Sequence, residues 1–199
     1  LNEGSQLDRE MMLDAIMLPS GNDASYCAAA VTGRIIAGDE TLPAEEAVNV
    51  FVNKMNEKAK EIGCKNTNFT CPDGFHNDNH YTTAMDLLRI TLYSQNYPEI
   101  AASGKKTYRE VEFLSGEYIY WNNSNKLIQP DSDDYYTYAT GLKTGMTDYS
   151  GHCVVATAER FGHELIIVCL GSESAAIRWN DTRALFDAGF AYIRDSDNG

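Results

Sequence analysis

Leu18-Pro19-Ser20-Gly21-Asn22-Asp23-Ala24 is the stretch around which the chain is organised. An apolar run that begins at Met11 precedes it, and a run of small residues that ends at Val31 follows it. Pro19 disfavours helix in the residue before it, and Gly21 permits a tight bend. The sequence therefore predicts a short loop between two helices. This loop presents a serine hydroxyl and an asparagine amide two positions apart.

Ser20 and Asn22 form one of two short patterns whose residue types suit chemistry. The other is Lys143-Thr144-Gly145, which lies in a strand-like stretch near the end of the chain. Taken alone, the first is a common turn and the second an ordinary strand end. Because they occur in this order, one between helices and one on a strand, we interpret both as parts of a functional site.

Together the two patterns resemble the penicillin-binding superfamily, whose signature is Ser-x-x-Lys, then Ser-x-Asn, then Lys-Thr-Gly. The form Ser-Gly-Asn points, within that superfamily, to the serine-type D-Ala-D-Ala carboxypeptidases, the low-molecular-weight penicillin-binding proteins. The resemblance runs from about residue 7 to residue 193. The segments that carry it are 12–24, 55–63, 65–69 and 141–145.

One element of the signature is missing where the family has it. Residues 1–19, which precede Ser20, contain no Ser-x-x-Lys pattern. The pattern occurs at Ser103-Gly104-Lys105-Lys106, but this stretch follows Ser20 and reads as a connector rich in glycine and lysine, so we interpret it as chance. The chain therefore resembles a carboxypeptidase domain that lacks its N-terminal part, the part that carries the nucleophile.

Hydrophobic periodicity predicts helices first and strands second. Short turns between the last strands predict antiparallel neighbours. The predicted helices cover residues 8–18, 23–32, 41–62, 83–96 and 175–194, with a hairpin over 106–121 that turns at Ser115-Gly116, and strands over 138–144, 152–159 and 164–170.

The resemblance gives these elements a fold. It implies an α/β, penicillin-binding or β-lactamase-like domain, with an antiparallel sheet flanked by helices plus a helical lobe, incomplete at its N-terminus. We expect one transpeptidase-like domain over residues 1–199. Within it, about 1–104 form the mainly helical lobe, and about 105–199 form the hairpin, the sheet and the C-terminal helix.

The resemblance also implies roles for the two patterns in acyl transfer through a covalent serine ester. The absent Ser-x-x-Lys would supply nucleophile and base. Ser20 would relay a proton towards the departing D-alanine, Asn22 would bond the substrate amide, and Lys143 would stabilise negative charge in the cleft. Thr144 would donate to the terminal carboxylate. Gly145 would leave room for a peptide along the strand edge.

The expected function is that of a D-alanyl-D-alanine carboxypeptidase, a serine-type hydrolase acting on peptidoglycan stem peptides, with this chain alone inactive. Peptidoglycan peptides and β-lactams would be its partners. Two alternatives stay open: a non-catalytic domain that binds peptidoglycan peptides, and a β-lactamase. Against the β-lactamase, no matching glutamate-containing deacylation motif lies between Ser20 and Lys143.

Charge and hydropathy exclude other classes of partner. The chain has 16 lysines and arginines against 29 aspartates and glutamates, a net charge of -13. Nucleic acid and anionic membrane surfaces are therefore poor partners, since binding phosphate needs clustered basic residues. No apolar run approaches the length of a membrane span. An extracytoplasmic location, secreted, periplasmic or at the cell surface, follows only from the family resemblance.

A crowded loop raises the question of a metal. Cys71, Asp73, His76, Asp78 and His80 lie close together in the sequence. Their spacing matches no closed zinc pattern, and their setting is a polar turn. We therefore expect no metal and no other cofactor, and a structural role for the second histidine.

Two further features have competing interpretations. Arg178, near the start of the last helix, could attract a carboxylate, but we interpret it as a solvated arginine. Tyr118, Tyr120 and Trp121 could form a platform for a sugar ring, but packing of the hairpin is the simpler interpretation.

Overall fold

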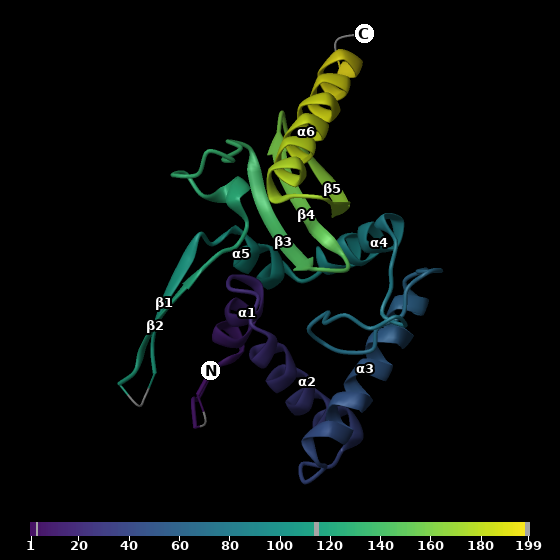
Figure 1. Ribbon diagram of the computed structural model, residues 1–199, viewed down its shortest axis with the longest axis vertical. Coiled ribbons are helices and arrows are strands. Elements are labelled where there is room, and N and C mark those ends of the chain that lie inside the picture. The colour runs from purple at the N-terminus through teal and green to yellow at the C-terminus, as the bar shows by residue number, and fades with distance from the viewer. Residues whose placement is uncertain (3, 114–115, 198–199) are drawn as a thin grey trace.

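The computed structural model of the chain describes residues 1–2, 4–113 and 116–197. The helices are α1 (Arg9–Met17), α2 (Asn22–Ala37), α3 (Ala44–Glu61), α4 (Ala84–Ser94), α5 (Pro98–Lys105) and α6 (Ala175–Asp197); the strands are β1 (Tyr108–Glu112), β2 (Tyr118–Asn122), β3 (Ala139–Thr147), β4 (Gly151–Arg160) and β5 (His163–Ser172) (Figure 1). Helices α1 to α4 correspond to the four helices predicted before the strands, with boundaries that differ by a few residues.

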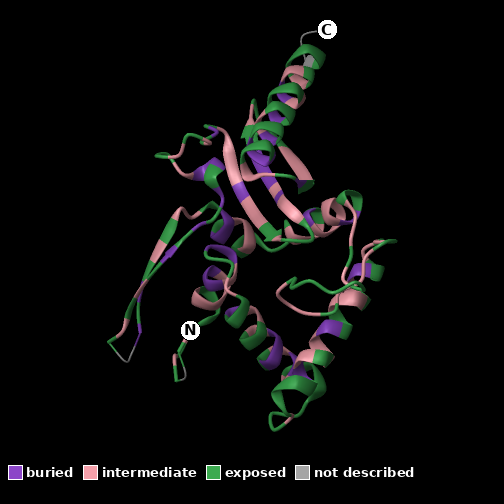
Figure 2. Ribbon diagram, in the orientation of Figure 1, coloured by how far each residue is buried: buried purple, intermediate pink, exposed green. Residues whose placement is uncertain are grey.

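β3, β4 and β5 form a three-stranded antiparallel sheet in chain order, which confirms the predicted pairing. Helix α6 lies across one face of this sheet (Figure 1). Side chains of one strand face alternate sides, so Ala156 and Ala158 both point towards α6. The buried residues of this core are Leu127, Tyr136, Val154, Ala156, Ala158, Trp179, Phe186 and Phe190. Figure 2 shows the buried residues gathered along the strands and on α6.

The opposite face of the sheet packs on α5. Gly104 of α5 meets Leu142 of β3 so closely that a Cβ at residue 104 would lie 2.8 Å from the Leu142 Cδ1 atom. Thr157 lies on the same side, 3.4 Å from the position of a Cβ at Gly141. Helices therefore cover both faces of the sheet, and packing from both sides holds β3 in position.

Helix α5 corrects one prediction. Residues 103–106 were expected in a connector, but Ser103 and Gly104 lie in a helix that begins with Pro98 at its first turn, a position that suits proline. Ser103 is 2% exposed, and its hydroxyl donates to Asp14 Oδ1 at 2.6 Å. The Ser-x-x-Lys pattern at this serine is therefore part of the packing between α5 and α1, which agrees with its interpretation as chance.

Helix α2 is longer than predicted. It was expected to end at Gly33, but it continues to Ala37, and Gly38 ends it in a left-handed conformation. Gly33 is a contact residue, because a Cβ there would lie 1.8 Å from the backbone oxygen of Ala47 in α3. The glycine thus allows the backbones of α2 and α3 to touch.

The hairpin of β1 and β2 pairs Arg109 with Trp121. Trp121 is buried, which agrees with a packing role. Tyr118 and Tyr120 are exposed but also contact β1: Tyr120 stacks on Tyr108 with centroids 5.0 Å apart, and the Tyr118 hydroxyl donates to Glu110 at 2.6 Å. The predicted turn at Ser115-Gly116 falls partly on residue 115, which lies outside the described residues. Within the described part of the chain, no helix combines the length and the apolar character needed to cross a membrane.

A buried carboxylate joins α1 to the rest of the molecule. Asp14 is fully buried, and Lys106 Nζ donates to its Oδ2 at 2.6 Å. Arg109 donates to the same oxygen, and Ser103 donates to the other. Burial raises the pKa of Asp14, but hydrogen bonds from Lys106, Ser103 and Arg109 together outweigh it and hold the pKa below its usual value. The aspartate is therefore ionised at neutral pH and fixes α1 against α5 and β1.

Asp14→Asn tests this anchor. The substitution leaves two cations without their buried partner, so we expect the free energy of unfolding to fall by about 2–3 kcal/mol, measured by urea denaturation at pH 7. Glu10→Gln is the matched control, because Glu10 contacts the same lysine but is 67% exposed, and we expect about 0–1 kcal/mol from it.

The pH dependence of the same anchor has a defined sign. The pKa of Asp14 is lower in the folded state than in the unfolded state, so its contribution to stability is present above the unfolded pKa and is lost as the pH falls through the folded pKa. The difference between the wild type and Asp14→Asn should therefore shrink in acid. A constant difference down to acid pH would contradict the ionised anchor.

Candidate active site

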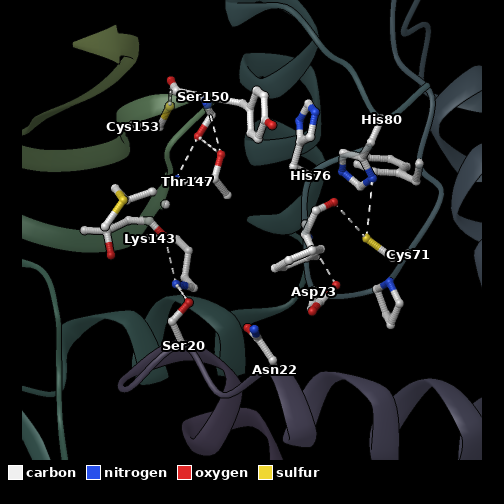
Figure 3. Close-up of a pocket in the computed structure, with 18 of the residues that line it drawn as sticks. Ser20, Asn22, Cys71, Asp73, His76, His80, Lys143, Thr147, Ser150 and Cys153 are labelled. Atoms are coloured by element: carbon white, nitrogen blue, oxygen red, sulfur yellow. Dashed lines mark hydrogen bonds between the residues drawn. The ribbon is translucent and has the colours of Figure 1, made fainter. Parts of the chain in front are cut away.

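The five residues of the two sequence patterns meet in one cleft between the helices and the sheet (Figure 3). The cleft has a volume of about 970 Å³. Most of its lining comes from three segments: the loop before α2 with the first turn of that helix, the end of β3 with the turn that follows, and the loop between α3 and α4. The predicted residues that line it are Ser20, Asn22, Lys143, Thr144 and Gly145.

The central contact of the cleft joins the two patterns. Lys143 Nζ donates to Ser20 Oγ at 2.6 Å and to the backbone oxygen of Thr144 at 2.8 Å. Asn22, at the first turn of α2, points into the same space (Figure 3). A hydroxyl, an amide and an amine therefore face one cavity from both of its sides.

Local structure presents the Ser20 hydroxyl to Lys143. Ser20 has a φ of 61°, a left-handed conformation that is unfavourable for a residue with a side chain. The loop is held on both sides of it: Leu18 is fully buried, and the backbone N–H of Gly21 donates to the oxygen of Ala15 at 3.0 Å. Packing of the neighbours thus holds the serine in a strained conformation.

Burial lowers the pKa of Lys143 to about 8. Removal from water disfavours the charged amine, since a desolvated cation loses its hydration. The amine is therefore mostly protonated at pH 7, yet it can release a proton at a small free-energy cost. Such a group can act both as a positive charge and as a proton carrier.

A second hydroxyl pair lies beside the first. Thr144 Oγ1 and Ser124 Oγ are 2.6 Å apart. The backbone N–H of Ser124 donates to the oxygen of Leu18 at 3.0 Å, so the segment after β2 is tied to the loop that carries Ser20. The sequence interpretation missed Ser124, because an asparagine-rich link gives no signal of where its side chains point.

Gly145 lies on the free edge of β3. The three-stranded sheet pairs β3 with β4 on one side, and the other edge borders the cleft. A Cβ at Gly145 would meet its nearest described neighbour, the Cβ of Cys153, at 3.9 Å, so the fold itself does not require glycine. The absence of a side chain matters for what can lie along the edge.

The loop between α3 and α4 forms the third wall, which the sequence interpretation did not assign to the site. Asp86 holds the start of this loop, since its Oδ2 accepts from the backbone N–H groups of Lys65 and Asn66 at 3.0 and 2.7 Å. Further on, the ring of His76 stacks on Tyr149 of the β3–β4 turn, with centroids 3.7 Å apart. Exposed aromatic residues in a polar loop were the signal that could have pointed to this wall.

The cysteine and histidines of this wall do not form a metal centre. His80 Nδ1 accepts from the backbone N–H of Thr70 at 3.1 Å, and burial lowers the pKa of the imidazole. Cys71 Sγ lies 3.6 Å from the same nitrogen, and burial raises the pKa of its thiol. Among the described residues, no group of three or more potential ligands is arranged to hold a metal ion.

Arg178 corrects a prediction, because it is not solvated. It is 7% exposed, and its Nη1 donates to the backbone oxygen of Cys153 at 3.1 Å. Cys153 pairs with Gly145 in the sheet, so this positive charge lies one strand behind the cleft edge. The Cζ atom of Arg178 lies 3.8 Å from the centroid of the Trp179 ring. Neither this stacking nor burial against the sheet can be predicted from the residues that neighbour Arg178 in the sequence.

The titration of Lys143 is the direct test of this site. In an NMR titration that follows the Cε resonances, Lys143 should have a midpoint near pH 8. Lys106 is the internal control: burial lowers its pKa, but the hydrogen bonds that it donates to Asp14 and Glu10 outweigh this effect and raise the pKa above that of free lysine. A Lys143 midpoint at or above that of Lys106 would contradict the buried amine.

Comparison with known proteins identifies the family to which this chain is similar. Residues 1–174 match the sequence pattern of the family described as D-alanyl-D-alanine carboxypeptidase. The D-alanyl-D-alanine carboxypeptidase DacF of Bacillus subtilis is 32% identical over 192 residues, which are 96% of this chain and 45% of the relative. The D-alanyl-D-alanine carboxypeptidase of Streptomyces sp. strain K15 is 30% identical over 94% of this chain and 62% of its own length. The chain thus spans about half the length of the curated relatives it matches.

Solved structures confirm the predicted fold class. The crystal structure of the Streptomyces K15 DD-transpeptidase superposes with a TM-score of 0.86 at 29% identity, over 96% of this chain and 71% of that one. Penicillin-binding protein D2 of Listeria monocytogenes, in its ampicillin-bound form, gives a TM-score of 0.69 at 27% identity, over 90% of this chain and 66% of that one. The match to the family covers most of the chain, and the paired patterns line one cleft. The chain therefore belongs to the D-alanyl-D-alanine carboxypeptidase family.

Proposed function

We propose that this chain forms the proton-relay and substrate-binding part of a serine D-alanyl-D-alanine carboxypeptidase that acts on peptidoglycan stem peptides. The observation that carries the proposal is the 2.6 Å hydrogen bond from Lys143 to Ser20, beside a free strand edge. We assign the serine that forms the acyl-enzyme to a Ser-x-x-Lys element outside these 199 residues, because Ser103 is buried and Ser20 occupies the Ser-x-Asn element of the signature. The chain alone is therefore inactive.

Ser20 and Lys143 act together on the leaving group. When the peptide bond breaks, the departing D-alanine nitrogen needs a proton. The Ser20 hydroxyl passes that proton on and is resupplied by Lys143, whose pKa of about 8 makes the transfer inexpensive near neutral pH. Asn22 donates to the carbonyl oxygen of the substrate amide from the helix side of the cleft.

The terminal carboxylate of the substrate binds near Thr144. Its hydroxyl is hydrogen-bonded to that of Ser124 at 2.6 Å, so one of the two O–H groups is used within the pair and the other is available to the carboxylate. Lys143 and the buried Arg178 supply positive charge on this side, and an anion among such donors gains charge-assisted hydrogen bonds. The backbone of the peptide then adds to the edge of β3 at Gly145, as an extra strand.

The relatives support the same class of ligand. The Listeria protein was solved with ampicillin bound, and the Streptomyces protein is described as a DD-transpeptidase and as a D-alanyl-D-alanine carboxypeptidase. We extend β-lactams and stem peptides to this chain as ligands of the cleft. A location outside the cytoplasmic membrane follows from such a substrate.

Binding of a short peptide tests the recognition half of the proposal. Acetyl-D-alanyl-D-alanine should bind about tenfold more tightly as the free acid than as the C-terminal amide, measured by isothermal titration calorimetry, because the amide lacks the charge that Lys143 and Thr144 recognise. Gly145→Val should weaken the acid about tenfold while leaving the melting temperature unchanged. Glu159→Val, a β-branched substitution at an exposed position of β4, is the control. Equal affinity for acid and amide would refute the carboxylate site.

Intact mass after incubation with a labelled penicillin tests the catalytic half. We expect no adduct on this chain, because neither Ser20 nor Ser103 is placed as a nucleophile. A longer polypeptide that contains a Ser-x-x-Lys segment before residue 1 should gain one adduct. An adduct on the 199-residue chain would overturn the assigned roles, and no adduct on the longer polypeptide would favour a domain that only binds peptides.

A further inference from the structure

One side of the hairpin of β1 and β2 carries exposed tyrosines. In an antiparallel pair, directly opposite residues point to the same side, and successive residues of one strand point to opposite sides. The register therefore separates two faces, of which one contains the buried Val111 and Trp121. Figure 1 shows the hairpin extending away from the three-stranded sheet. We call its other side the tyrosine face, formed by the exposed residues Tyr108, Glu110, Glu112, Tyr118, Tyr120 and Asn122.

The stacked rings of this face stay open to solvent. Tyr108 and Tyr120 have ring centroids 5.0 Å apart and an angle of 15° between their planes. Each ring covers the other on one side, yet Tyr108 is still 51% exposed and Tyr120 49%. Tyr118, which is 60% exposed, lies on the same side of the same strand as Tyr120. Three exposed rings gathered on one face of a hairpin indicate a binding surface.

The opposite side of the hairpin holds the tyrosine face in a fixed position. Val111 and Trp121 are buried in one core with Leu18, the residue that follows α1. Arg109, between them and the start of β1, donates to the buried carboxylate of Asp14. The rings are therefore presented on an ordered element, and a ligand that binds them does not have to order the backbone first.

Polar groups border the rings. Glu110 lies directly opposite Tyr120 and accepts from the Tyr118 hydroxyl at 2.6 Å, and Asn122 lies directly opposite Tyr108. Carboxylate and amide oxygens accept hydrogen bonds from hydroxyl groups, and the amide nitrogen donates to them. Flat apolar rings with such groups beside them match a pyranose sugar, which has C–H bonds on its faces and hydroxyl groups around its rim.

Charge excludes one class of polymer from this face. Glu110 and Glu112 are both exposed on it and repel a polyanion. A basic protein segment would be attracted, but pairs of exposed charges contribute little to affinity. The ring surface is therefore the larger source of affinity, and it favours an uncharged ligand with flat faces. The sugar strand of peptidoglycan, built of the N-acetylated sugars that carry the stem peptides, is such a ligand.

We propose that the tyrosine face binds the sugar strand of peptidoglycan. This inference rests on the proposed function, which identifies the polymer. The chain continues from this face into the cleft, because the segment after Asn122 carries Ser124, whose hydroxyl is bonded to that of Thr144. A sugar strand held on the hairpin keeps the cleft beside the polymer while stem peptides enter and leave it, which raises their effective concentration.

An uncharged oligosaccharide tests the tyrosine face directly. Tetra-N-acetylchitotetraose, titrated into the ¹⁵N-labelled 199-residue chain, should shift the amide resonances of β1 and β2 and leave those of α6 in place. Tyr108→Ala and Tyr120→Ala should each weaken this binding about tenfold, because each removes part of the ring surface. Tyr120→Phe should keep most of the affinity, because the ring remains.

Tyr192→Ala is the matched control, since Tyr192 is 76% exposed but belongs to α6. It should leave the affinity for the tetrasaccharide unchanged. If the wild type does not bind the tetrasaccharide, or if Tyr108→Ala and Tyr120→Ala weaken it no more than Tyr192→Ala does, the sugar site is refuted.

A dipeptide separates this inference from the proposed function. Both hairpin variants should retain the wild-type affinity for acetyl-D-alanyl-D-alanine, which also shows that they are folded. Binding of the dipeptide without the tetrasaccharide would refute the sugar site and leave the proposed function standing. Binding of the tetrasaccharide without the dipeptide would overturn the proposed function and, with it, the identity of the polymer.

Salt separates a sugar from a basic protein segment. Affinity for the tetrasaccharide should not change as salt is added, because no charge pairs form, and hexalysine should not displace it. If hexalysine instead shifts the resonances of β1 and β2, loses this effect in salt, and the tetrasaccharide does not bind, the face is a surface for basic segments and the inference is wrong.

Insoluble peptidoglycan tests the polymer itself. With the cleft saturated by acetyl-D-alanyl-D-alanine, the wild type and Tyr192→Ala should sediment with the polymer. The double variant Tyr108→Ala/Tyr120→Ala should remain largely in solution. Equal sedimentation of all three would contradict binding of the sugar strand by the hairpin.

Discussion

The buried carboxylate of Asp14 is the constraint on which the cleft depends. It lies in the short helix that delivers Ser20, and it collects donors from α5 and from the first strand of the hairpin. A buried charge needs several such partners, and those available to Asp14 come from segments about 90 residues further along the chain, as for Lys106. The helix therefore takes its position only when these segments are folded. The geometry of Ser20 is thus set by long-range packing, although its motif is local.

The cleft and its border contain several features that lower the stability of the folded state. Lys143 is a half-buried cation, Arg178 is buried behind the same strand edge, and Ser20 holds a left-handed conformation. Each is costly in a stable scaffold. Ser20 and Lys143 place polar groups in the cleft, and Arg178 lies one strand behind its edge. Their coincidence supports a functional site independently of the sequence patterns. The strong packing of α6 and α5 on the sheet provides the rigidity that tolerates them.

The sequence predicted the features that depend on a few adjacent residues. The loop of Ser20, the strand of Lys143 and the antiparallel order of the last strands follow from turn residues and periodicity. Helix α5 was missed, because its small and polar residues show no helical pattern of apolar residues in the sequence. Its packing against β3 becomes visible only in the tertiary structure. Arg178 was misread, since burial by a sheet is not visible in the helix that carries it. His76 and Tyr149 come from separate loops, and only the tertiary structure brings their rings together.

The contact at Gly33 has a mechanical consequence. Because the backbone of α2 touches that of α3 at Ala47, with no side chain between them, sliding of the two helices would break this close packing, and we expect them to move as one unit. Asn22 begins α2 next to the Ser20–Gly21 loop, whereas the loop that carries His76 follows α3. A rotation of the pair about the Ser20–Gly21 loop would therefore move the wall of His76 further than it moves Asn22. We expect variation in the width of the cleft to be largest on the side of His76.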